Sequence, residues 1–157
     1  MSKVKILFVC LGNICRSPLA EAIFHHKIRA RQLGHLVEAD SCGTANYHVG
    51  DSPDERTIAN ATKNGVNISH RGRQLTEEDL DYYDYILAMD KSNQSNILRL
   101  AQEHHTSKIK LMRSFDPAGG LEVPDPYYGT ERDFQEVFDI LNRTMDKFID
   151  QLHEKHF

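Results

Sequence analysis

Short apolar runs alternate with amphipathic segments along the chain, beginning near its first residues. Residues 4–9 form a run of β-branched and aromatic side chains, interrupted only by Lys5, with the length and composition of a buried strand. From Pro18 onward apolar residues recur at helical spacing, and Ser17 followed by Pro18 matches a helix start signal. The pattern predicts a strand that passes through a tight loop into a helix.

The same alternation continues to the end of the chain. Further strands are predicted at Leu36–Ala39, Tyr85–Met89 and Lys108–Met112. Ser52-Pro53 repeats the helix start signal, Gly65 ends the helix that follows it, and Asp90 opens another helix. Glu131–His153 carries apolar residues in three- and four-residue steps, which is typical of an amphipathic helix packed on a core.

Strands that alternate with helices predict an open α/β fold with a parallel sheet and right-handed crossovers. In such sheets ligands bind beyond the carboxyl ends of the strands. The loop Leu11–Ser17 leaves the carboxyl end of the first predicted strand, so its position nominates it as the functional site. The long connection Arg113–Thr130 is a second candidate, because loops of this length in compact domains usually serve a function.

Length and composition narrow the class of protein. A chain of 157 residues with 39% hydrophobic and 27% charged residues is typical of one globular domain, here spanning residues 1–157. The net charge of −4 argues against nucleic acid as a partner, and the absence of an apolar run near ~20 residues argues against a membrane span. Three cysteines are too few for a disulfide framework, which favours free thiols and a cytoplasmic location.

The segment Cys10-Leu11-Gly12-Asn13-Ile14-Cys15-Arg16-Ser17 places a thiol five residues before a guanidinium and a hydroxyl, at a turn from strand into helix. Backbone N–H groups of such a loop and the N-terminus of the following helix suit a bound phosphate. Gly12 and Asn13 tolerate the positive φ angles that a tight cradle requires. Arg16 offers a fork of donors to phosphate oxygens, and the same donors favour the thiolate of Cys10, which is the form that acts as a nucleophile.

A thiolate that attacks phosphorus expels an oxyanion, so an acid is needed to protonate the leaving oxygen. Asp125 is the best candidate, because it lies in the long connection and the rings of Pro124 and Pro126 restrict the backbone on both sides.

Together these motifs closely resemble the low-molecular-weight protein tyrosine phosphatases. The resemblance covers almost the whole chain and rests on Cys10–Ser17, Ser41-x-Gly43-Thr44, Tyr47, Gly50, Ser69-His70, Arg73-Gln74, Met89-Asp90 and Asp125-Pro126-Tyr127-Tyr128. It implies a flavodoxin-like, open twisted four-stranded parallel sheet with helices on both faces. It also implies hydrolysis of phosphotyrosine and aryl phosphate monoesters through a phosphocysteine, with no metal and no cofactor.

Residue by residue, the resemblance makes Cys10 the nucleophile, Arg16 the group that binds phosphate and the transition state, and Asp125 the general acid and then the base for water. The implied phosphate-binding loop is Leu11, Gly12, Asn13, Ile14, Cys15, Arg16 and Ser17. Ser17 would also steady the Cys10 thiolate as it leaves. Tyrosine-phosphorylated proteins are the implied substrates, and inorganic phosphate is the implied product inhibitor.

Other roles follow from the same resemblance. Asn13, Ser41 and His70 would hold the loop in shape, although His70 taken alone is typical of a solvent-exposed histidine. Tyr47, Tyr127 and Tyr128 would form the rim of the substrate pocket. Cys15 would protect Cys10 by a reversible disulfide. Cys42 departs from the small residue that is usual in the family, and the sequence suggests no role for it.

Three alternatives remain open. An arsenate reductase on the same fold relays oxidation through later cysteines, but no cysteine follows Cys42 in this sequence. A protein arginine phosphatase typically has threonine where this chain has Ile14. A non-catalytic phosphate-binding module would need neither Cys10 nor Asp125.

Overall fold

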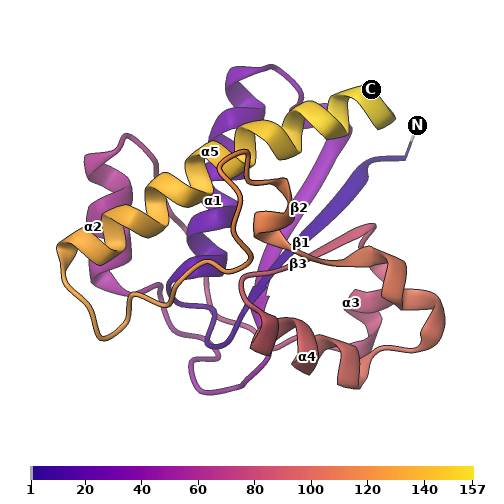
Figure 1. Ribbon diagram of the computed structural model, residues 1–157, viewed down its shortest axis with the longest axis horizontal. Helices are drawn as coiled ribbons and strands as arrows, with labels where there is room; N and C mark the ends of the chain where they lie inside the picture. Colours follow the sequence, from indigo (N-terminus) through magenta and orange to yellow (C-terminus); the bar gives the residue numbers. More distant parts are fainter. Residues whose placement is uncertain (1) are drawn as a thin grey trace.

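The computed structural model describes residues 2–157 and has a four-stranded parallel sheet at its centre (Figure 1). The strands are β1 (Val4–Cys10), β2 (Val37–Gly43), β3 (Tyr85–Ala88) and β4 (Ile109–Leu111), and their order in the sheet is β2-β1-β3-β4. The predicted open α/β fold with a parallel sheet is therefore confirmed.

Helices lie on both faces of the sheet, as predicted (Figure 1). The helices are α1 (Arg16–Ala30), α2 (Glu55–Lys63), α3 (Glu77–Tyr82), α4 (Lys91–Leu100) and α5 (Glu131–His156), with short 3-10 turns at η1 (Gly34–Leu36), η2 (Glu103–Lys108) and η3 (Met112–Phe115). Figure 1 shows α1, α2 and α5 on one side of the strands and α3 and α4 on the other. Among residues 2–157, no helix combines the length and the apolar character that crossing a membrane requires.

The alternating side chains of β1 explain this two-sided cover, because successive residues of a strand point to opposite faces. Ile6 and Phe8 belong to the core cluster beneath α1 and α5, where the rings of Phe8 and Phe24 lie 5.7 Å apart. Leu7 and Val9 belong to the other cluster, beneath α3 and α4. All four of these β1 side chains are fully buried, so the central strand appears in the sequence as one continuous apolar run.

The prediction for the second strand was wrong at both ends. Leu36 belongs to η1, and β2 continues beyond Ala39 to Gly43. The continuation is polar because β2 lies at the edge of the sheet and its side chains find partners: Asp40 accepts from Arg73, and Ser41 is fully buried beside the loop that follows β1. The third and fourth predicted strands are confirmed, each one or two residues shorter than expected.

Two helix starts also differ from the prediction. α1 begins at Arg16, and Ser17 lies inside the helix with its hydroxyl bonded to loop side chains. α2 is capped by Asp54, whose carboxylate accepts from the N–H of Arg56, and not by Ser52. The start of α4 at Asp90 is confirmed, since its carboxylate accepts from the N–H of Asn93.

The short helix α3 was not predicted from the sequence. Its signal was a capping box, in which the Thr76 hydroxyl accepts from the N–H of Asp79 and the Asp79 carboxylate accepts from the N–H of Thr76. Asp79 was overlooked because the six-residue helix is too short to show hydrophobic periodicity.

Candidate active site

The loop between β1 and α1 turns its carbonyl oxygens outward. The carbonyl oxygen of Leu11 accepts from the N–H of Ala45 at 3.0 Å, and that of Ile14 accepts from the N–H of Asp54 at 2.8 Å. Within residues 2–157, no backbone N–H from Leu11 to Cys15 donates to another backbone group. These amides, next to the N-terminus of α1, are therefore available to an anion.

Gly43 lets the loop lie against the end of β2. It pairs with Cys10 in the sheet, and a Cβ on Gly43 would stand 2.6 Å from the carbonyl oxygen of Leu11. Any larger residue at this position would displace the loop, because real Cβ atoms do not approach so closely.

Asn13 has a φ of 57°, which is strained for a residue with a side chain, and its amide is bonded on every side. Its Nδ2 donates to the hydroxyls of Ser17 at 2.8 Å and Ser41 at 3.1 Å. Its Oδ1 accepts from the N–H of Arg73 at 3.1 Å and lies 2.7 Å from Nε2 of His70. The side chain that holds the loop is itself fully satisfied.

His70 is not exposed, so the interpretation of this residue in isolation was wrong. Only 9% of its side chain is accessible, and its Nδ1 lies 3.3 Å from a carboxylate oxygen of Glu21. The same Glu21 oxygen accepts from the hydroxyl of Ser41 at 2.8 Å. Glu21 was missed by the sequence analysis, although it lies one helical turn after Ser17 on the buried side of α1.

Cys10 ends β1 with its side chain at the base of the loop and 3% exposed. Its Sγ lies 3.0 Å from the hydroxyl oxygen of Ser17. Because Asn13 already donates to that oxygen, the hydroxyl proton of Ser17 is free to point at Sγ or at the carbonyl oxygen of Cys42, 3.3 Å away.

Arg16 is held from behind by two acceptors. Its Nη1 donates to the carboxylate of Asp90 at 2.7 Å and to the carbonyl oxygen of Val123 at 3.0 Å. Burial works against its charge, but Cys10 and Asp90 outweigh burial and raise the pKa of Arg16. The other nitrogen, Nη2, faces Asp125 at 3.9 Å and remains available to a ligand. Asp90 was noted in the sequence as a helix start and as part of the Met89-Asp90 motif, but its contact with Arg16 was not predicted.

The long connection before α5 is anchored by buried ion pairs. Asp116 accepts from Arg113 at 2.9 Å and from Arg143 of α5 at 3.0 Å, and its side chain is fully buried. Arg113 also donates to the carbonyl oxygens of Gly119 and Glu122. These contacts position the residues that follow Glu122 near the carboxyl ends of the strands.

Asp125 stands at the edge of the loop, with half of its side chain exposed. Its Oδ1 accepts from the N–H of Tyr127 at 3.1 Å, which leaves Oδ2 facing Arg16. The carboxyl group is thus aimed toward the loop by a turn, as the prolines on either side suggested.

A cavity of about 340 Å³ opens above Cys10. Its lining consists of Cys10, Leu11, Gly12, Ile14, Cys15, Arg16, Tyr47, His48, Asp125, Tyr127 and Tyr128. The three predicted tyrosines all lie on it, with exposed fractions of 38% for Tyr127, 71% for Tyr47 and 96% for Tyr128. Asn13, Ser17, Ser41 and His70 lie behind the loop and hold it, outside the lining.

A family model described as low molecular weight phosphotyrosine protein phosphatase matches residues 5–156. The chain belongs to this family. A Saccharomyces cerevisiae protein named low molecular weight phosphotyrosine protein phosphatase is 41% identical over 140 residues, covering 87% of each chain. The similarity extends to solved structures. A protein tyrosine phosphatase from Entamoeba histolytica, solved with Hepes in its active site, has a TM-score of 0.95 and 38% identity, covering 99% of this chain and 100% of that one. A Drosophila arginine phosphatase has a TM-score of 0.88 and 32% identity, covering 97% and 98%.

The other two cysteines of this phosphatase differ from Cys10 in their surroundings. Cys15 lies in the cavity wall, 6% exposed, and burial raises the pKa of its thiol to about 12. Cys42 is fully buried in β2, and burial raises the pKa of its thiol well above the usual range. Both therefore remain thiols at neutral pH.

Two groups of side chains in residues 2–157 bring potential metal ligands together. Glu21, Asp40 and His70 form the first, and they already serve the network behind the loop. Asp81, His104 and His105 form the second. There, Nδ1 of His105 accepts from the N–H of Gln102, so Nε2 carries the proton that bonds to Asp81 and has no lone pair for a metal.

Proposed function

We propose that this phosphatase hydrolyses phosphotyrosine and aryl phosphate monoesters through a phosphocysteine, with no metal. The observation that carries the proposal is that Cys10, Arg16 and Asp125 meet in one cavity whose mouth is lined by tyrosines. The cavity thus combines a nucleophile, a phosphate donor fork and an acid, with aromatic side chains that suit a phenyl ring. The non-catalytic phosphate-binding module is disfavoured, because binding alone would require neither Cys10 nor Asp125.

In the first step the Cys10 thiolate attacks phosphorus and forms an S–P bond. The P–O bond to the phenol breaks, and Asp125 gives its proton to the departing oxygen. The free N–H groups of the loop and Nη2 of Arg16 bind the three remaining phosphoryl oxygens, whose charge they stabilise in the transition state.

In the second step Asp125, now ionised, takes a proton from water as the water oxygen attacks phosphorus. The S–P bond breaks and its electron pair returns to Cys10, where the hydroxyl of Ser17, 3.0 Å away, stabilises the thiolate. Inorganic phosphate is released, and because it fits the same loop we propose that it is a competitive product inhibitor.

Phosphotyrosine is favoured over phosphoarginine by the cavity wall. Ile14 lies on that wall and presents only an apolar side chain, with no hydroxyl to accept from a guanidinium. The similarity to the Drosophila arginine phosphatase makes phosphoarginine the alternative to be tested directly. The arsenate reductase alternative still lacks the distal cysteines that relay oxidation, since none follows Cys42.

The central experiment compares the parent with Cys10→Ser on 4-nitrophenyl phosphate, a phosphotyrosine peptide and a phosphoarginine peptide, in the presence of a metal chelator. We expect the parent to hydrolyse the first two substrates and the variant to hydrolyse none while still binding vanadate, because the loop survives and the thiolate does not. Cys42→Ser serves as the matched control, since Cys42 lies outside the cavity lining. Undiminished turnover in Cys10→Ser, or faster hydrolysis of phosphoarginine, would refute the assignment.

Cys15 is proposed to protect the nucleophile. A peroxide oxidises the Cys10 thiolate to a sulfenic acid, and the Cys15 sulfur then displaces water to form a disulfide that an added thiol reduces again. Cys15→Ser should therefore recover less activity than the parent after peroxide and then thiol, and bound phosphate should slow the inactivation of both. Equal recovery in the two proteins would show that Cys15 has no protective role.

The proposal also covers domain organisation, cellular location and partners. We propose that residues 1–157 form a single phosphatase domain, acting in the cytoplasm on tyrosine-phosphorylated proteins, without nucleic acid or membrane as a partner. Support comes from the family match over residues 5–156, the free cysteines and the net charge of −4.

A further inference from the structure

His48 lies on the wall of the active-site cavity and has no part in the reaction described above. It belongs to the segment that connects β2 to α2 and follows Tyr47 at the mouth of the cavity. About a third of its side chain is exposed, so a molecule that enters the cavity meets the imidazole.

The backbone around His48 is built to hold it there. The N–H of Gly50 donates to the carbonyl oxygen of Gly72 at 2.8 Å, and the N–H of Gly72 donates to that of Asp51 at the same distance. A Cβ on Gly72 would overlap the carbonyl oxygen of His48, so only glycine permits this approach. The turn is thereby clamped to the segment that also carries the loop-supporting His70.

The imidazole itself is fixed on two sides. Its Nδ1 lies 3.1 Å from a carboxylate oxygen of Asp51, which can only accept, so Nδ1 carries a proton. The ring lies over Gly12 of the phosphate loop, where a Cβ would stand 3.1 Å from Cδ2 of His48. Nε2 lies on the same edge of the ring and has no hydrogen-bond partner within the described residues 2–157. A held ring with one uncommitted nitrogen is suited to contact a ligand.

We propose that His48 determines substrate specificity by donating from protonated Nε2 to a carboxylate on a residue that flanks the phosphotyrosine. This inference rests on the proposed phosphotyrosine activity. The phosphoryl group is bound deeper, by the loop amides and Arg16, whereas His48 stands beside Tyr47 where the neighbouring residues of a peptide must pass. Because Nδ1 is bonded to the carboxylate of Asp51, Nε2 is the nitrogen left to donate to an anionic partner when the ring is charged.

The preference for acidic peptides should disappear as the pH rises, because neutral His48 has no proton on Nε2. The other titratable or charged groups near the ring are Asp51 on its own turn, Arg71 beside Gly72, and Cys10, Cys15, Arg16, Tyr47, Asp125, Tyr127 and Tyr128 around the cavity. All of these act on both members of a peptide pair that differs only in one flanking residue. The ratio of the two rates therefore isolates the contact with His48.

The test measures kcat/KM for two phosphotyrosine peptides, one with glutamate and one with glutamine on either side, at pH 5.5 and pH 8. For the parent we expect a ratio of about two to five in favour of glutamate at pH 5.5, the range of a partly exposed ion pair, and a ratio near one at pH 8. His48→Gln should show a ratio near one at both pH values. His48→Arg, whose charge does not titrate, should keep the preference at both.

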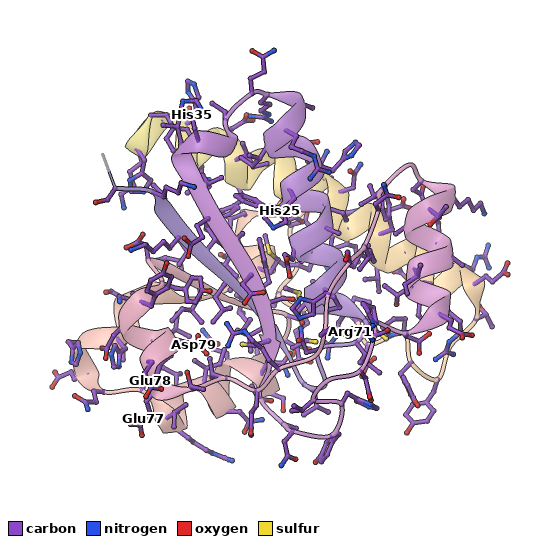
Figure 2. The ribbon with its side chains drawn as sticks, turned by 180° about the vertical axis from the view of Figure 1, so that it is seen from behind. His25, His35, Arg71, Glu77, Glu78 and Asp79 are labelled. Carbon is purple, nitrogen blue, oxygen red and sulfur yellow. The ribbon has the colours of Figure 1, made fainter. Side chains whose placement is uncertain are left out.

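His35→Gln is the matched control, because His35 is exposed and Figure 2 places it at the opposite end of β2 from the site. It should behave as the parent does. A parent ratio near one at pH 5.5, or a preference that persists in His48→Gln, overturns the role of His48 while leaving the phosphatase activity intact. Failure to hydrolyse either phosphotyrosine peptide would instead contradict the proposed function itself.

Discussion

Replacing Asp125 with asparagine removes one proton and little else. The carbonyl oxygen of the new amide can still accept from the N–H of Tyr127, as Oδ1 does at 3.1 Å, so the turn that aims the side chain is retained. What is lost is the acid that protonates the leaving oxygen and the base that later activates water. Asp125→Asn therefore tests the chemistry of this position with little change in its geometry.

The expected loss depends on the leaving group. General acid catalysis is usually worth about 100- to 10,000-fold, and we place this site near the lower end because half of the Asp125 side chain is open to water, which can partly replace the acid. For phosphotyrosine, whose phenol is strongly basic, we expect a loss of about 100-fold, or ~2.7 kcal/mol of transition-state stabilisation. For 4-nitrophenyl phosphate, which leaves as a stable anion, the loss should stay below about tenfold.

Single-turnover phosphorylation of Cys10, measured with a series of substituted aryl phosphates, separates this step from hydrolysis of the intermediate. The variant should show a steeper dependence of rate on leaving-group basicity than the parent. It should also lose the fall in rate at alkaline pH that deprotonation of the acid causes. Asp150→Asn, on the exposed side of α5, serves as the control and should match the parent.

An unchanged leaving-group dependence in Asp125→Asn would refute the assignment. Two other carboxylates, those of Asp90 and Glu122, are already engaged and are poorly placed to substitute for it. Asp90 accepts from Arg16 and caps α4, and Glu122 accepts from the N–H of Lys91 at 2.9 Å.

Three other perturbations have definite outcomes. Arg16→Lys should lower kcat/KM by about 100-fold or more in a phosphatase assay, because one ammonium cannot both bond to Asp90 and reach two phosphoryl oxygens. Gly43→Ala should reduce phosphate affinity, measured by competitive inhibition, since the added methyl would displace the loop carbonyl of Leu11. Asp116→Asn should destabilise the fold at neutral pH by about 1–3 kcal/mol in urea unfolding. Burial alone would raise the pKa of Asp116, but hydrogen bonds from arginine side chains and a backbone N–H lower it from 3.8. The ionised carboxylate therefore stabilises the fold fully above pH 3.8, and this stabilisation is lost as the pH falls through the lower pKa of the folded state. The difference between parent and variant should accordingly shrink below about pH 3.8.

The sequence by itself determined the architecture and the centre of the chemistry. The buried run of β1, the periodicity of α5 and the spacing from Cys10 to Arg16 are all set by residues close together along the chain. Each can therefore be interpreted without knowing which distant residues pack against it. The prolines around Asp125 likewise restrict its backbone wherever the segment lies.

Tertiary structure decided everything that depends on a partner distant in sequence. The polar half of β2 continues the strand because its backbone pairs with β1, while Arg73 and the loop satisfy its polar side chains. Ser17 serves the loop and not the helix start, because Asn13 bonds to it. His70 lies against Glu21, and no spacing rule connects the two residues in the sequence. The hydrophobic pattern shows which side chains avoid water, but not which polar groups will contact one another. The active site is built from such polar contacts.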